Sequence, residues 1–213
     1  MIGSTKWESR LQKIALVIVR LLLAYLFFTQ LWWKTPPTYG CPPDFALTTS
    51  DASGRLQRTS GLCDWTGVQA VWAARPHPIL VSNLDNIGAP EISVDIGFLA
   101  QLNGAFIDGF VRSNMSWFGT VVFLMEALIF LSLFFGLFSR LGALVGLALS
   151  LQLWIGLAGI SNPFEWEWSY NFLPVLAFLM LAFAPGRYFG LDALIRPRLL
   201  KGGKFARALA WLT

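Results

Sequence analysis

Residues 117–138 read WFGTVVFLMEALIFLSLFFGLF, and Glu126 is the one charged side chain among them. A helix that crosses the hydrocarbon core of a bilayer needs about 20 apolar residues. This stretch meets that requirement. A charge near the middle of a span costs a few kcal/mol, so it usually faces the protein interior or a ligand. We therefore predict a membrane helix here and treat Glu126 as a candidate functional residue.

Three other stretches are similar: Ile14–Trp33, which carries Arg20, then Leu141–Ile160 and Tyr170–Gly186. The chain is 55% hydrophobic and only 13% charged, whereas soluble domains carry about 25% charged residues. The prediction is an all-α membrane protein: a four-helix transmembrane bundle whose helices are 14–33, 117–138, 141–160 and 170–186. A long extracytoplasmic insertion, 34–116, lies between the first two helices.

Positive charges set the expected orientation, because Lys and Arg are enriched in cytoplasmic segments. They occur in the N-terminal segment 1–13, in the turn at Arg140 and in the C-terminal segment 187–213. The loop between the last two spans has none. We predict cytoplasmic termini in a multi-pass protein of a prokaryotic plasma membrane. Segment 187–213 interleaves basic and apolar residues, as an amphipathic segment on anionic lipid does; a solvated tail is the alternative.

The insertion holds both cysteines, Cys41 and Cys63. An oxidising exterior permits a disulfide between them; two free thiols are the alternative. Ile96, Leu99, Phe106 and Phe110 recur at helical spacing near its end, which predicts an interfacial helix that leads into the second span.

Arg20 and Glu126 form the first candidate site. At 1.5 Å per residue, their depths in the two spans differ by about 7 Å, which an Arg and a Glu side chain together can bridge. A buried ion pair would clamp the two helices together. The same two charges could instead hold a ligand headgroup or a proton.

A second polar group is expected at the outer ends of the first and fourth spans: Gln30, Lys34, Glu167 and Tyr170. Trp and Tyr at this level commonly anchor helices at the interface, but they could also frame the entrance to a site for a flat ring such as a quinone. In the third span, Gly142, Gly146 and Ser150 are spaced by four, which favours close helix packing.

Other features narrow the function classes. The basic residues flank apolar segments rather than lining a groove, so we expect no nucleic-acid binding. The single histidine, His77, lies outside the predicted spans and no Cys-x-x-Cys occurs, so we predict no metal site and no covalently bound cofactor. Redox chemistry would have to pass through a bound molecule or through a partner's cofactor.

Several residues resemble the DoxX/DoxD family of four-helix membrane proteins. They are Arg20 in the first span with Lys34 at its end, Glu126, the Gly136–Arg140 turn, and the closing run APGRYFGLDALI (Ala184–Ile195). DoxD members form the small subunit of thiosulfate:quinone oxidoreductase, so the resemblance implies a role in electron transfer.

Two functional hypotheses follow. In the first, the chain is an accessory subunit, without catalysis of its own, of a larger respiratory or photosynthetic electron-transfer complex. In the second, it is a quinone-binding subunit of an enzyme like thiosulfate:quinone oxidoreductase. Both predict other membrane subunits as partners, and both predict bound lipid.

Overall fold

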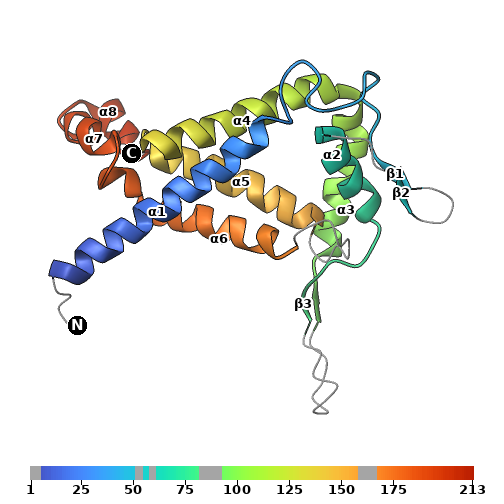
Figure 1. Ribbon diagram of the computed structural model, residues 1–213, viewed down its shortest axis with the longest axis horizontal. Coiled ribbons are helices and arrows are strands. Elements are labelled where there is room, and N and C mark those ends of the chain that lie inside the picture. Colours follow the sequence, from blue (N-terminus) through green and yellow to red (C-terminus); the bar gives the residue numbers. More distant parts are fainter. Residues whose placement is uncertain (1–5, 51–54, 58–60, 82–92, 158–166) are drawn as a thin grey trace, which may run out of the picture. The chain divides into compact units, whose positions relative to one another are not determined.

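The computed structural model describes residues 6–50, 55–57, 61–81, 93–157 and 167–213, and Figure 1 labels their elements. The chain divides into two compact units. Unit 1 comprises Met1–Trp32, Leu124–Leu149 and Leu173–Thr213, and unit 2 comprises Trp33–Phe123 and Ser150–Phe172. The described part of the chain is predominantly helical.

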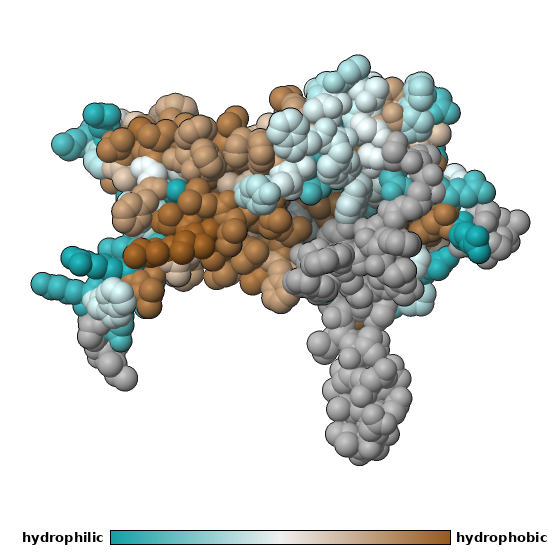
Figure 2. Space-filling model, viewed as in Figure 1, coloured by the Kyte–Doolittle hydropathy of each residue, from teal (hydrophilic) through white to brown (hydrophobic). Residues whose placement is uncertain are grey.

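Unit 1 is built from four long helices and the C-terminal segment. It contains α1 (Lys6–Leu31) and parts of α4 (Met115–Phe135), α5 (Ser139–Leu157) and α6 (Glu167–Phe183). All four helices contribute to one hydrophobic core, which includes Leu23, Ile129, Ala143 and Met180. Many other apolar side chains of these helices are exposed, and Figure 2 shows them as brown surface over unit 1. Such a surface suits contact with lipid.

The helices agree in part with the predicted spans. Among the described residues, three helical segments are long and apolar enough to cross a membrane: Lys6–Leu31, Gly97–Phe135 and Ser139–Leu157. The fourth predicted span, 170–186, corresponds to the shorter apolar helix Asn171–Phe183. The helix ends there because Ala184 adopts a left-handed conformation (φ 44°) just before Pro185.

The predicted interfacial helix and the second span form one continuous helical run. The run consists of α3 (Gly97–Phe106), a π-helical turn (Ile107–Val111), a 3-10 turn (Arg112–Asn114) and α4. Its 39 residues are nearly twice the roughly 20 that one crossing of a membrane needs. The run is therefore longer than a single span.

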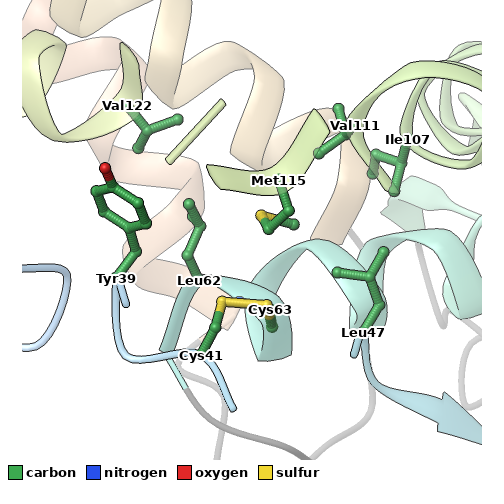
Figure 3. Close-up of a cluster of buried hydrophobic side chains, with 9 residues drawn as sticks. All are labelled: Tyr39, Cys41, Leu47, Leu62, Cys63, Ile107, Val111, Met115 and Val122. Atoms are coloured by element: carbon green, nitrogen blue, oxygen red, sulfur yellow. A yellow bond between two sulfur atoms is a disulfide. The ribbon is translucent and has the colours of Figure 1, made fainter. Parts of the chain in front are cut away.

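Unit 2 is organised around a disulfide. Its remaining elements are α2 (Gly61–Trp72) and two antiparallel ribbons, β1 (Thr49–Ser50) with β2 (Leu56–Gln57), and β3 (Pro78–Val81) with β4 (Ser93–Asp95). Figure 3 shows Cys41 and Cys63 joined within a cluster of buried apolar side chains. Their Cα atoms are 5.3 Å apart. The disulfide prediction is confirmed.

The C-terminal segment of unit 1 contains two short helices, α7 (Asp192–Leu200) and α8 (Lys204–Leu209). Pro197 lies within α7, and the helical run is interrupted at Gly202 and Gly203. Glycine disfavours helix because its backbone loses the most conformational freedom on folding.

Candidate functional site

The turn between α4 and α5 in unit 1 has an unusual backbone. Gly136 and Phe138 both have positive φ, 60° and 49°, so the backbone reverses within three residues. Backbone N–H groups of the C-terminal segment, far along the sequence, form hydrogen bonds to this turn. Leu191 N–H donates to the Phe135 carbonyl at 3.0 Å, and Asp192 N–H donates to the Gly136 carbonyl at 2.8 Å.

The Asp192 carboxylate caps the start of α5. It accepts hydrogen bonds from Phe138 N–H at 2.7 Å, Ser139 N–H at 2.9 Å and Ser139 Oγ at 2.6 Å, and it is fully buried. The first N–H groups of a helix have no partner within the helix, and a negative charge is stabilised there. Asp192 therefore caps α5 from 53 residues away in the sequence.

Arg20 reaches the same turn from α1. Its side chain is only 3% exposed, and Nη1 donates to the Pro185 carbonyl at 3.4 Å. A Cβ on Gly136 or Gly190 would lie 2.5 Å or 2.9 Å from that same Nη1, so the guanidinium occupies the space that these glycines leave open. Asp192 attracts the charge. Arg20 thus joins α1 to both segments that form the turn.

Glu126 is also buried, at 2% exposed, and it lies on the α4 face that carries Ile129 and Leu133. Those two residues belong to the core of unit 1, and spacings of three and seven place side chains on one helix face. The carboxyl group is therefore directed into the core.

The structure does not bring Arg20 to Glu126, and the predicted ion pair needs correction. The Arg20 guanidinium lies against Gly136, ten residues beyond Glu126, which is about 15 Å along a helix. Helical side chains also lean toward the N-terminus, so the Glu126 carboxyl points away from the turn. The prediction took Ile14 as the inner end of the first span and counted the depth of Arg20 from there. In the structure α1 begins at Lys6 instead, so that count did not give the position of Arg20 relative to Glu126.

The outer polar group is described only in part. Gln30 is half-buried in unit 1. In unit 2, Lys34 is buried, its Nζ lies 4.5 Å from the centroid of the Trp33 ring, and Trp33 stacks on Trp65. The side chains of Glu167 and Tyr170 lie outside the described residues.

The small residues of α5 pack against α4 of the same chain. A Cβ on Gly142 would lie 2.4 Å from Ser132 Oγ, and one on Gly146 would lie 3.5 Å from Ile129 Cγ2. This part of the α5 face is therefore already covered. Ser150 is buried in unit 2.

Unit 2 contains a side-chain amide cluster that the sequence did not reveal. Gln69 Oε1 accepts from Asn103 Nδ2 at 2.8 Å and from Gln152 Nε2 at 2.6 Å, and Gln152 Nε2 also donates to Asn103 Oδ1 at 3.0 Å. A Cβ on Gly156 would lie 2.3 Å from Gln69 Oε1. The cluster joins α2, α3 and α5, and no sequence spacing could indicate it because the residues are up to 83 positions apart.

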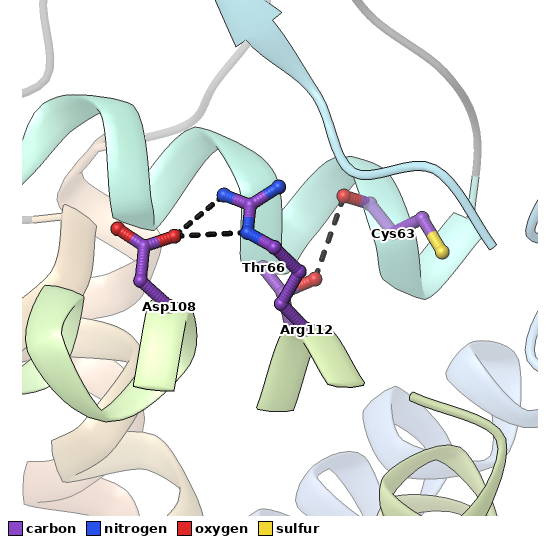
Figure 4. Close-up of polar contacts among 4 residues, drawn as sticks. All are labelled: Cys63, Thr66, Asp108 and Arg112. Atoms are coloured by element: carbon purple, nitrogen blue, oxygen red, sulfur yellow. Dashed lines mark hydrogen bonds and ion pairs between the residues drawn. The ribbon is translucent and has the colours of Figure 1, made fainter. Parts of the chain in front are cut away.

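Two further polar contacts of unit 2 join residues that are close in sequence. Figure 4 shows Arg112 paired with Asp108, with Nη2 2.5 Å and Nε 3.1 Å from Oδ1, and Thr66 Oγ1 donating to the Cys63 carbonyl at 3.4 Å. The Arg112–Asp108 pair is exposed and spaced i to i+4 along the helix, so it contributes little to stability.

The comparisons agree with the closing motif that contains Asp192. No curated protein and no solved structure matches this chain. A family model described as "TQO small subunit DoxD" matches residues 104–210. That match covers half of the chain and includes Glu126, the α4–α5 turn and Asp192. The chain belongs to the DoxD family.

Proposed function

We propose that this protein is an accessory membrane subunit, without catalysis of its own, of an electron-transfer complex related to thiosulfate:quinone oxidoreductase. Family membership supports a membrane subunit of this kind. The accessory role rests on the contacts that Arg20 and Asp192 make in the structure. Both charges serve to close the α4–α5 turn, so they hold the fold rather than face a substrate.

The proposed placement follows the charge pattern and the helices. In this arrangement α1, α4, α5 and α6 form a four-helix transmembrane bundle in a prokaryotic plasma membrane. The positive charges near both ends of the chain support a cytoplasmic position for the termini. The disulfide between Cys41 and Cys63 supports an exterior position for residues 34–116, where disulfides persist. Other membrane subunits are the proposed partners.

The test asks whether this chain attaches its partner subunits to the membrane or takes part in thiosulfate oxidation itself. Cells that lack this chain are compared with complemented cells for thiosulfate oxidation, using a soluble acceptor (ferricyanide) and a ubiquinone analogue. We expect the ferricyanide activity to persist and to move to the soluble fraction, and the quinone-linked activity to be lost. Loss of both activities with the partner subunits still present would refute the accessory role, as would thiosulfate oxidation by the purified chain alone.

Glu126 favours a second candidate function, a quinone-binding subunit. A quinone site needs apolar walls and a few polar groups that contact the ring oxygens. Glu126 supplies one buried carboxyl group on the core face of α4, so this residue fits such a site. A quinone bound there would accept electrons from a partner, and Glu126 would hold or supply a proton at its carboxyl oxygen.

One variant distinguishes the two functions. In complemented membranes, Glu126→Gln keeps the shape of the side chain but cannot deliver a proton. If the subunit is accessory only, the variant keeps the full quinone-linked rate. If Glu126 serves a bound quinone, that rate falls at least tenfold while the ferricyanide rate and the amount of protein stay unchanged.

A further inference from the structure

In unit 1, Arg140 at the start of α5 and Arg187 after the end of α6 both bond to backbone oxygens of residues 211–213. Arg196 lies on α7, which packs against the Pro185–Arg187 turn. Burial lowers the pKa of Arg187, and the charges of Arg140 and Arg196 lower it further, while Asp192 acts in the opposite direction. The Asp192 carboxylate already accepts three hydrogen bonds from the α5 start. The carboxylate that opposes these positive charges at Arg187 is therefore already committed to the start of α5, and like charges held together favour an added anion.

Backbone oxygens hold two of these guanidinium groups in place. Arg140 donates from Nε to the Leu181 carbonyl at 3.1 Å, and from Nη2 and Nη1 to the Ala182 and Trp211 carbonyls, both at 3.4 Å. Arg187 donates from Nε and Nη2 to the Thr213 backbone oxygen at 2.8 Å and 2.5 Å. Each guanidinium has five N–H donors, so both keep donors for a further acceptor.

Arg196 completes the cluster and has an unsatisfied donor. Its Nε is buried and has no hydrogen-bond partner among the described residues. A buried N–H without a partner costs free energy that an oxygen of a bound anion would recover. Guanidinium groups bind phosphate oxygens through paired N–H donors, so a phosphate fits the chemistry of this cluster.

Exposed apolar side chains lie on the same C-terminal segment as Arg187 and Arg196. Phe205 is 77% exposed and Leu194 is 63% exposed. Trp211 is exposed too, and the Arg140 guanidinium lies 5.4 Å from its ring centroid. Aromatic side chains of this kind are typical of the membrane interface, and they suit contact with acyl chains rather than with water.

The depth of the cluster matches the lipid headgroups. Arg140 is the second residue of α5, and Arg187 follows the end of α6 by four residues. A residue this close to the end of a membrane helix lies in the headgroup layer, which is about 5–8 Å thick on each side of the hydrocarbon core. A free phosphate would not account for the apolar surroundings, whereas a phospholipid would.

We propose that Arg140, Arg187 and Arg196 bind the phosphate of an anionic phospholipid whose acyl chains lie against the apolar residues of α7 and α8. The site rests on the membrane placement of unit 1 and not on any electron-transfer role. It would tie the closing segment of the fold to one leaflet.

The test titrates phosphatidylglycerol onto the delipidated full-length protein in neutral detergent, followed by native mass spectrometry, with phosphatidylcholine as the comparison lipid. We expect phosphatidylglycerol to bind at least tenfold more tightly. Arg196→Gln removes no hydrogen bond among the described residues, so it should leave folding intact, and it should weaken binding about fivefold. Arg198→Gln, an exposed change of equal charge on the same helix, should weaken it less than twofold.

Three results would overturn the proposal. Equal binding of the two lipids would show that the headgroup charge is not recognised. Equal losses in the two variants would indicate diffuse attraction to the basic segment instead of a site. Displacement of the lipid by 10 mM inorganic phosphate would identify a soluble anion as the ligand.

Discussion

Replacing Asp192 with alanine should destabilise unit 1 more than any conservative surface change. The carboxylate is fully buried and accepts three hydrogen bonds, from two backbone N–H groups and the Ser139 hydroxyl. Alanine would leave these donors without their acceptor at the start of α5. It would also remove the negative charge that attracts Arg20.

The expected cost follows from these contacts. Hydrogen bonds to charged groups contribute about 1.5–3 kcal/mol each, but bonds to one carboxylate do not add fully. Removing one partner from a buried charged network costs about 3–5 kcal/mol, and we expect Asp192→Ala to fall in that range. Asp192→Asn keeps one acceptor oxygen but places an NH₂ group against the remaining donors. It should cost about 1–3 kcal/mol.

The measurement is the midpoint of thermal loss of the monodisperse peak on size exclusion in dodecylmaltoside. For a chain of this length, 1 kcal/mol corresponds to about 2–4 °C. Asp192→Ala should therefore lower the midpoint by roughly 6–20 °C, and Asp192→Asn by less. Asp108→Asn is the matched control, because Asp108 is exposed in an i, i+4 pair with Arg112; such a pair contributes about 0.3–0.5 kcal/mol. If Asp192→Ala and the control shift the midpoint equally, the closure of the turn by Asp192 is wrong.

The remaining predictions use the same chain with its own controls. Gly136→Ala should cost about 2–4 kcal/mol in the thermal assay, because alanine disfavours positive φ and its Cβ would lie 2.5 Å from Arg20 Nη1. Gly146→Ala is the control and should be neutral, because the nearest atom to its Cβ would be 3.5 Å away. Equal shifts of the thermal midpoint in the two variants would contradict this explanation. Glu126→Gln should accumulate normally, whereas Glu126→Leu should lower the yield of monodisperse protein because leucine cannot form polar contacts. Normal yields of both variants would exclude Glu126 as an organising group of the core. Cys41→Ser should lower the stability of unit 2 by about 3 kcal/mol and speed its digestion by trypsin; an unchanged digestion rate would contradict a stabilising disulfide.

Local sequence was sufficient for the features that depend on composition and periodicity. The apolar stretches predicted the long helices, and each of the three long apolar segments among the described residues overlaps a predicted span. The two cysteines predicted the disulfide, and the motif APGRYFGLDALI pointed to the family. These features follow from residue type and short-range spacing, which the sequence contains directly.

The roles of the buried charges could not be read in this way. Arg20 and Glu126 were both predicted to be buried, and both are, but depth along two helices does not determine which way each side chain points. The sequence showed Asp192 only as part of a family motif. Its role as a cap could not be predicted, because its partners lie 53 and 54 residues earlier in the chain.

The sequence by itself determined that this chain is helical, suited to a membrane and related to DoxD proteins, because burial in lipid restricts composition along every span. Only the tertiary structure decided that Arg20 serves the α4–α5 turn, that Asp192 caps α5 and that Arg140 and Arg187 both bond to the backbone of residues 211–213. Those contacts join residues far apart in the chain, and they form only once the helices pack and bring the segments together.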